Sequence, residues 1–182
     1  NGDLKLDEDT TDVFGRPART WSYEGDEIGT FAQKELMVAE YTTAVTGKDL
    51  YDDVGKTAYD NYDFYSYVNG EESDLYKEIS RNNKDNVNEI DDGALTQVFV
   101  DTDDETVTVT VINTYLAKAS SDYNEKRDEV TFTVYGLNNS TKPVTVSGED
   151  FAIEDVAEDD FVLVTYADKE IQSISEIGRA HV

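Results

Sequence analysis

Apolar and polar residues alternate along several short segments of the chain. The segment TVTVTV at 106–111 alternates valine with threonine, and EVTFTVY at 129–135 has the same period. A period of two is typical of half-buried β-strands. The segment DFVLVTY at 160–166 is apolar on both faces, as expected of a strand inside a barrel or sandwich. The pattern therefore predicts a mainly β protein.

Turn-forming residues lie where hairpins between these strands need them. Asn69 and Gly70 follow the segment YDFYSYV, and Asp168 and Lys169 follow FVLVTY. Asn-Gly suits the positive φ values of a tight turn between two strands. The acidic stretch DTDDE at 101–105 separates QVFV from TVTVTV. We therefore expect three hairpins at these places.

Helix signals are scarce. The segment GKDLYDDVG after Thr46 predicts about two helical turns. Ser73 could cap a second helix over SDLYKEISRN, but we favour a strand at 75–79 because that segment aligns with KEIQSIS further along the chain. The polar stretch at 81–93 is expected to be a connector.

Two parts of the sequence resemble each other and predict a repeat. VTGKDLYDDV at 45–54 aligns with VSGEDFAIEDV at 146–156, and each is followed by a strand and a turn of the same character. We infer two small tandem antiparallel β modules, barrel- or sandwich-like, with about five or six short strands each. In chain order, we expect a linker at 1–11, the first module at 12–92 and the second module at 93–175.

The final residues, 176–182, are expected to be a tail that is not native to the protein. IGRAHV can be back-translated to a sequence that resembles a common sequencing-library adapter, and a GAG codon for Glu176 completes the start of that adapter. The alternative is an ordinary frayed terminus. Both interpretations leave His181 without a function.

Composition excludes several function classes. The chain has 41 acidic residues against 15 basic ones, which gives a formal charge of −26. So acidic a surface repels nucleic acid and anionic lipid. There is no cysteine, which removes disulfides and thiolate chemistry. We expect no nucleic-acid partner and no direct membrane insertion, because no apolar run approaches about 18 residues.

Catalytic motifs are also missing from the sequence. The single histidine lies in the expected tail, so no nucleophilic triad can be assembled. The glycines are isolated and form no phosphate-binding loop. Carboxylates are abundant, but nothing separates two catalytic ones from the rest. We therefore predict no catalytic residues, no enzyme activity and no cofactor, with calcium as the open alternative.

Calcium prefers several carboxylate and carbonyl oxygens in flexible loops. The candidate metal ligands are Asp101, Asp103, Asp104 and Glu105, and a second acidic stretch lies at 154–160. Neither stretch is an EF-hand. The alternative, which the pattern favours, is a solvated acidic hairpin tip.

Four aromatic residues form a candidate glycan platform. Trp21 and Tyr23 alternate in TWSY, and Tyr65 and Tyr67 would share one side of their strand. Aromatic rings on one face can stack on sugars. The alternative, favoured because Val164 aligns with Tyr65, is that these rings fill a core.

The second half carries a family resemblance. GALTQVFVDTDDETVTVTVINTYLAKASSDYNEKRDEVTFTVYGL, followed by VTVSGEDF and DDFVLVTYADKEIQSI, resembles the β-rich segments of large bacterial surface proteins that carry S-layer homology domains. FGRPARTWSYEGDEIGTF resembles a matching earlier segment, so the similarity covers most of 12–175. The wall-anchoring S-layer homology motif itself is absent from this sequence.

The resemblance implies secretion to the bacterial cell surface or cell wall, a structural or adhesive role and no cofactor. Expected partners are a cell-wall or surface polymer, or neighbouring protein modules. The expected function is that of a fragment of an extracellular surface protein, acting as spacer or interaction modules. The alternatives are a carbohydrate-binding module and a calcium-stabilised β module.

Overall fold

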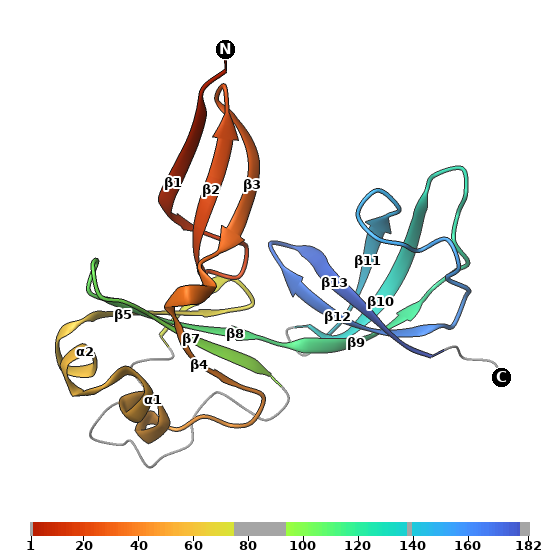
Figure 1. Ribbon diagram of the computed structural model, residues 1–182. Coiled ribbons are helices and arrows are strands. Elements are labelled where there is room, and N and C mark those ends of the chain that lie inside the picture. The colour runs from red at the N-terminus through yellow and green to blue at the C-terminus, as the bar shows by residue number, and fades with distance from the viewer. Residues whose placement is uncertain (1, 75–93, 138–139, 179–182) are drawn as a thin grey trace. The chain divides into compact units, whose positions relative to one another are not determined.

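The computed structural model describes residues 2–74, 94–137 and 140–178 (Figure 1). The chain divides into two compact units, residues 1–113 and residues 114–182. Both are built mainly from β-strands, and the helices are short. The predicted fold class, mainly β with antiparallel sheets and little helix, is confirmed.

The first unit opens with an antiparallel three-stranded sheet in the order β1-β2-β3. Its strands are β1 (Leu4–Thr11), β2 (Pro17–Tyr23) and β3 (Asp26–Ala32). The register between β1 and β2 shifts between Asp7 and Thr10, which marks a β-bulge. The structure differs here from the linker expected at 1–11. Polar side chains do not prevent pairing of the backbone, and β1 pairs with β2.

A five-stranded sheet in the order β4-β7-β8-β5-β6 forms the rest of the first unit. Its strands are β4 (Met37–Tyr41), β5 (Asp63–Val68), β6 (Glu71–Ser73), β7 (Leu95–Asp101) and β8 (Thr106–Ile112). The β5–β8 pair is parallel, whereas β4–β7, β7–β8 and β5–β6 are antiparallel. The helices are η1 (Lys34–Leu36), α1 (Gly47–Val54) and α2 (Lys56–Asn61).

Helix α1 begins with a capping box. The Thr46 hydroxyl accepts a hydrogen bond from the Asp49 backbone N–H at 3.1 Å, and the Asp49 carboxylate accepts one from the Thr46 N–H at 3.0 Å. This reciprocal pair satisfies two donors that a helix start leaves open. The helix buries Leu50 in the core of the sheet, among Val98, Val107 and Val109. The predicted helix is confirmed.

The second unit is a single antiparallel sheet in the order β11-β10-β9-β12-β13. Its strands are β9 (Thr114–Ala119), β10 (Glu129–Leu137), β11 (Ser140–Ser147), β12 (Phe161–Ala167) and β13 (Glu170–Gly178). Figure 1 shows this sheet curving around its own interior. Phe132, Val134, Val164 and Ile153 fill that interior. β13 continues into the expected tail, whose residues 179–182, with His181, lie outside the described residues.

The three predicted hairpins are present. Asn69 and Gly70 have φ values of 51° and 82°, and Asp168 and Lys169 have 52° and 63°. Two successive positive φ values suit the right-handed twist of the flanking strands. The acidic stretch at 101–105 joins β7 to β8.

The repeat boundary expected between residues 92 and 93 differs from the structure. β7 pairs with β4 and β8 pairs with β5, so the strands on both sides of that boundary form one sheet. The division between the compact units falls after residue 113 instead. The strand favoured at 75–79 and the connector expected at 81–93 lie outside the described residues.

The two segments aligned for the repeat also differ in structure. Residues 47–54 are helical, whereas 148–156 form turns. In the second segment the Ser147 hydroxyl accepts from the Glu149 N–H at 3.1 Å, and no capping box forms there. Ile153 then packs into the core of the second sheet.

Candidate functional site

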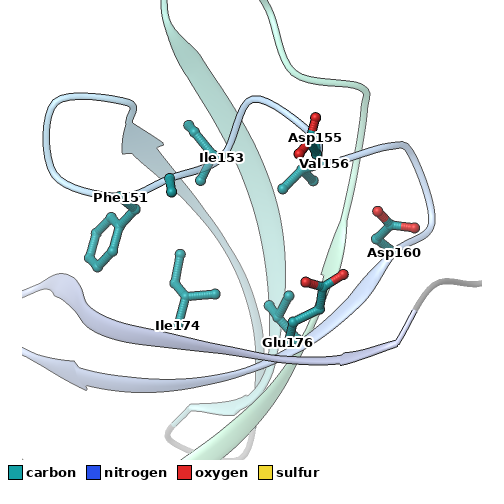
Figure 2. Close-up of a pocket in the computed structure, with 9 residues that line it drawn as sticks. Phe151, Ile153, Asp155, Val156, Asp160, Ile174 and Glu176 are labelled. Atoms are coloured by element: carbon teal, nitrogen blue, oxygen red, sulfur yellow. The ribbon is translucent and has the colours of Figure 1, made fainter.

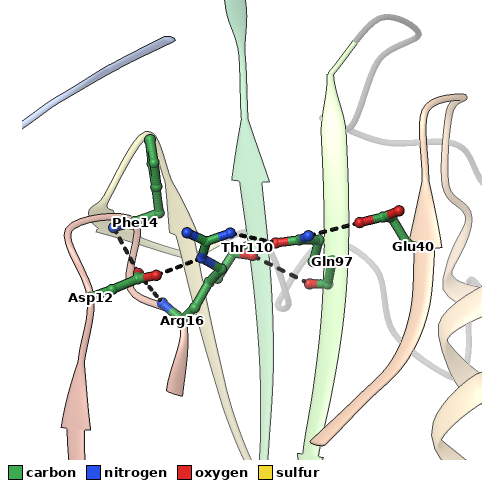
Figure 3. A network of polar contacts seen from close by, with 6 residues as sticks. All are labelled: Asp12, Phe14, Arg16, Glu40, Gln97 and Thr110. Atoms are coloured by element: carbon green, nitrogen blue, oxygen red, sulfur yellow. Dashed lines mark hydrogen bonds and ion pairs between the residues drawn. The ribbon is translucent and has the colours of Figure 1, made fainter. Parts of the chain in front are cut away.

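A tight turn connects β1 to β2 and fixes the base of the three-stranded sheet (Figure 3). One oxygen of the Asp12 carboxylate accepts from the backbone N–H groups of Phe14 and Arg16, each at 3.0 Å. The other accepts from Arg16 Nε at 2.6 Å. Gly15 takes a φ of +86°, which a residue with a side chain rarely adopts. The Asp12 carboxylate therefore closes the turn together with two backbone hydrogen bonds, from the Asp12 N–H to the Arg16 carbonyl and from the Gly15 N–H to the Asp12 carbonyl, each at 3.0 Å.

A polar chain joins this turn to the five-stranded sheet (Figure 3). Arg16 Nη1 donates to Gln97 Oε1 at 3.3 Å, and Gln97 Nε2 donates to Glu40 Oε2 at 2.8 Å. The Thr110 hydroxyl also donates to the Gln97 carbonyl at 3.5 Å. Gln97 is buried, so these bonds satisfy polar groups that water does not reach freely. The network connects the two sheets of the first unit.

A cavity of about 270 Å³ lies between these two sheets, and we call it the tyrosine pocket. The three-stranded sheet and its connections supply one group of lining residues: Glu8, Asp9, Thr10, Thr11, Gly15, Pro17 and Gln33. The five-stranded sheet supplies the others: Tyr65, Tyr67, Asp101, Asp104, Thr106 and Thr108. Two of the predicted platform residues thus share a pocket with two of the predicted metal ligands.

The aromatic part of the pocket comes from β5. Tyr65 and Tyr67 lie on one face of the strand, opposite Thr108 and Thr110 of β8. The Tyr67 ring packs directly on the glycine of the turn, because a Cβ placed at Gly15 would lie 2.3 Å from its Cγ atom. Burial raises the pKa of the Tyr67 hydroxyl, which stays protonated. Tyr65 is 41% exposed and so remains accessible to a ligand.

The acidic part of the pocket comes from the β7–β8 turn and from β1. One oxygen of Asp101 accepts from the backbone N–H groups of Asp103 and Asp104, at 3.0 and 3.1 Å. The neighbouring Asp101 charge raises the pKa of Asp104, with smaller contributions from desolvation and from Asp9. The carboxylates therefore lie close enough to repel one another. They present hydrogen-bond acceptors and negative charge to the cavity.

The hydroxyl part of the pocket comes from alternate residues of β8 and from β1. Thr108 is 7% exposed and lines the cavity. Within the described part of the chain, its hydroxyl has no hydrogen-bond partner. The pocket therefore contains a polar group that a ligand can satisfy.

The other two platform residues lie elsewhere. Trp21 and Tyr23 are on β2, opposite Leu6 and Leu4 of β1, and are 36% and 44% exposed. Residues opposite each other in a sheet share a face. Phe31 of β3 pairs with Arg19, which lies two residues before Trp21 on β2 and therefore on the same face. Phe31 is 61% exposed. We call this surface the aromatic face, defined by Leu4, Leu6, Trp21, Tyr23 and Phe31.

The predicted platform is therefore divided between two places, and none of its four residues is fully buried. The alternative that they fill a core does not describe Trp21 or Tyr23. Asp9, Gly15 and Thr108 are pocket residues that the sequence pattern did not identify. Of these three residues, only Thr108 could have been placed from the sequence, because it alternates with valines that lie in the core.

The four predicted calcium ligands are not gathered around one point. Among the described residues, no group of three or more histidine, cysteine, aspartate or glutamate side chains is arranged to hold a metal ion. Asp103 and Glu105 do not line the tyrosine pocket. The carboxylate of Asp101 accepts from two backbone N–H groups of the hairpin turn.

Removing calcium is therefore expected to leave the melting temperature unchanged. A site filled to about 100 times its dissociation constant would add roughly 2.7 kcal/mol of stability. That stabilisation would shift the melting temperature by several degrees. Thermal unfolding with millimolar calcium and with excess chelator measures the difference. A rise of several degrees with calcium, lost in Asp101→Asn, would restore the calcium hypothesis.

A second cavity, of about 290 Å³, lies in the second unit (Figure 2). Phe151, Ile153 and Ile174 lie toward one end of it, and Asp155 and Asp160 toward the other. The Asp160 carboxylate accepts from the Ala157 N–H at 2.9 Å and closes the loop before β12. The acidic residues of this cavity already have interaction partners within the chain.

Comparison with known proteins yields no relative. No protein-family model matches the chain, and no curated protein or solved structure matches it. Of the helices in the described ranges, none combines the length and the apolar character needed to cross a bilayer. The function is therefore inferred from the residues and their arrangement.

Proposed function

We propose that this chain is a non-catalytic part of an extracellular bacterial surface protein, in which small β units act as spacers and adhesive modules. The resemblance of its strand segments to S-layer homology proteins supports this proposal. So does the packing of the sheet interiors, because apolar side chains fill both cores. The observation that carries the adhesive role is the aromatic face.

The aromatic face presents large apolar side chains to solvent on a chain that is otherwise highly charged. Exposed apolar groups that cluster in one place commonly mark a surface that binds a partner. Trp and Tyr suit such a surface because they combine a rigid apolar ring with a polar atom. The net charge of −26 disfavours anionic polymers, so the partner we propose is an uncharged wall polymer or a neighbouring protein module.

Replacement of Trp21 or Phe31 with alanine is expected to weaken binding to purified Gram-positive cell walls by about tenfold or more, which corresponds to roughly 1.4 kcal/mol. Either change removes apolar area that binding would bury. Sedimentation of the protein with the walls, quantified over a concentration series, measures the affinity.

Leu116→Ala is the matched control, because Leu116 is a comparably exposed apolar residue, 41% exposed, in the second unit. It should bind as the parent does. Circular dichroism of each variant checks that the sheets are intact. Equal affinity of all three variants, or no affinity of the parent chain for walls, would contradict the adhesive role of the aromatic face.

A further inference from the structure

We propose that the tyrosine pocket binds a single sugar ring that carries no negative charge, either a neutral hexose or an amino sugar, as part of a surface polysaccharide. This inference rests on the proposed adhesive function and gives it a second, separate contact. The site differs from the aromatic face, since the pocket lining includes none of the five residues that define that face.

The Thr108 hydroxyl is available to a ligand in the pocket. It lines the cavity at 7% exposure, and no described residue forms a hydrogen bond with it. Hydroxyls donate and accept hydrogen bonds, as the hydroxyl groups of a sugar also do. A sugar hydroxyl can therefore form a hydrogen bond with the Thr108 side chain without displacing a partner within the described residues.

The tyrosines supply the apolar part of the site. The position of Tyr67 is fixed by its contact with Gly15, and Tyr65 beside it is exposed. Pockets that hold small ligands combine apolar or aromatic walls with a few placed polar groups. One face of a sugar ring carries C–H groups that pack on an aromatic ring, while its edge carries hydroxyls. The arrangement of Tyr65 beside Thr108 matches this division.

The carboxylates decide the charge of the ligand. Asp9, Asp101 and Asp104 contribute to the lining and accept hydrogen bonds from sugar hydroxyls or from an ammonium group. They repel uronic acids and phosphates. A divalent metal is disfavoured because no three described acidic side chains converge on one point. The volume of about 270 Å³ lies near the lower end of ligand sites and suits one ring.

The test titrates the intact chain with the methyl glycosides of glucose, galactose, mannose and glucosamine, with galacturonic acid, and with n-butylamine. Chemical shifts of the tyrosine ring protons report binding. We expect at least one neutral glycoside or the glucosamine glycoside to shift the tyrosine signals, and galacturonic acid to leave them unchanged. Thr108→Val and Tyr65→Ala should each weaken that binding by about tenfold or more.

Thr96→Val is the matched control for Thr108→Val. Thr96 is also a buried threonine whose hydroxyl has no partner among the described residues, but it does not line the pocket. Its variant should bind the sugar as the parent does. Because neither hydroxyl forms a hydrogen bond with a described residue, neither valine variant should unfold the sheet, and circular dichroism checks this.

Three results would overturn the proposal: no neutral or amino sugar binds, Thr108→Val binds as tightly as Thr96→Val, or n-butylamine binds as tightly as the sugars. The last result would make the pocket an amine site. Trp21→Ala should keep sugar binding while it loses wall binding. If the parent chain binds walls but no sugar, the pocket proposal alone is rejected. If the parent chain binds a sugar but no walls, the adhesive role of the aromatic face alone is rejected.

Discussion

The Asp12→Ala variant is expected to lower the free energy of unfolding of the first unit by roughly 3 kcal/mol and to abolish ligand binding in the tyrosine pocket. The Asp12 carboxylate, 10% exposed, accepts from the N–H groups of Phe14 and Arg16 and from the Arg16 guanidinium. Alanine leaves these donors without their acceptor. Urea unfolding followed by circular dichroism measures the loss of stability.

Asp12→Asn separates the two contributions of this side chain. The amide oxygen can still accept from the backbone of the turn, but the negative charge beside Arg16 is lost. We expect a smaller loss of stability than with alanine, and weakened rather than abolished sugar binding. Asp26→Ala removes an exposed aspartate from the opposite end of the same sheet and should change stability by less than about 0.5 kcal/mol. If Asp12→Ala unfolds like Asp26→Ala, the turn does not hold the sheets together.

The strands and hairpins could be predicted because their signals are local. Alternation of valine with threonine over 106–111 places the valines in a core, and Asn69-Gly70 provides two positive φ values. The same holds for α1, whose start is specified by Thr46 and Asp49, three residues apart. Each of these elements depends on neighbouring residues alone. The half-buried character predicted for the strand at 106–111 is wrong, because Thr108 and Thr110 on its other face are buried as well.

The assembly of these strands could not be predicted, because it depends on pairings between distant segments. β5 pairs in parallel with β8 across more than 30 residues, and β4 pairs with β7 across more than 50. Alternating strands satisfy the burial pattern with several neighbours, so the pattern does not choose among them. The repeat boundary at 92/93, which was inferred from the similar sequences at 45–54 and 146–156, therefore falls within the five-stranded sheet.

The candidate site was predictable to a similar extent. Tyr65 and Tyr67 share a face because residues two apart on a strand always do. Asp9 could not be assigned, since the bulge between Asp7 and Thr10 changes which side chains face the pocket. The separation of Trp21 from Tyr65 follows from the placement of one sheet on another, which neither segment encodes by itself.

Phe132→Ala is expected to destabilise the second unit by about 3–5 kcal/mol and to leave the first unit folded. Phe132 is fully buried in the core of that unit, where the alanine variant would leave a cavity. Hydrogen exchange followed by mass spectrometry measures the result. Peptides from β9 to β13 should lose protection, whereas those from β7 and β8 should keep it, because β7 and β8 pair with β4 and β5.

Leu50→Ala is the reciprocal variant, since Leu50 is fully buried in the core of the first unit. It should cost about 2–5 kcal/mol and remove protection from β4, β5, β7 and β8, while β9 to β13 keep theirs. The two variants distinguish the observed division after residue 113 from the sequence-based boundary at 92/93. With the earlier boundary, β7 and β8 would open together with β10 and β12 in Phe132→Ala. Exchange of β7 and β8 in step with β10 would therefore reject the division into units described for the fold.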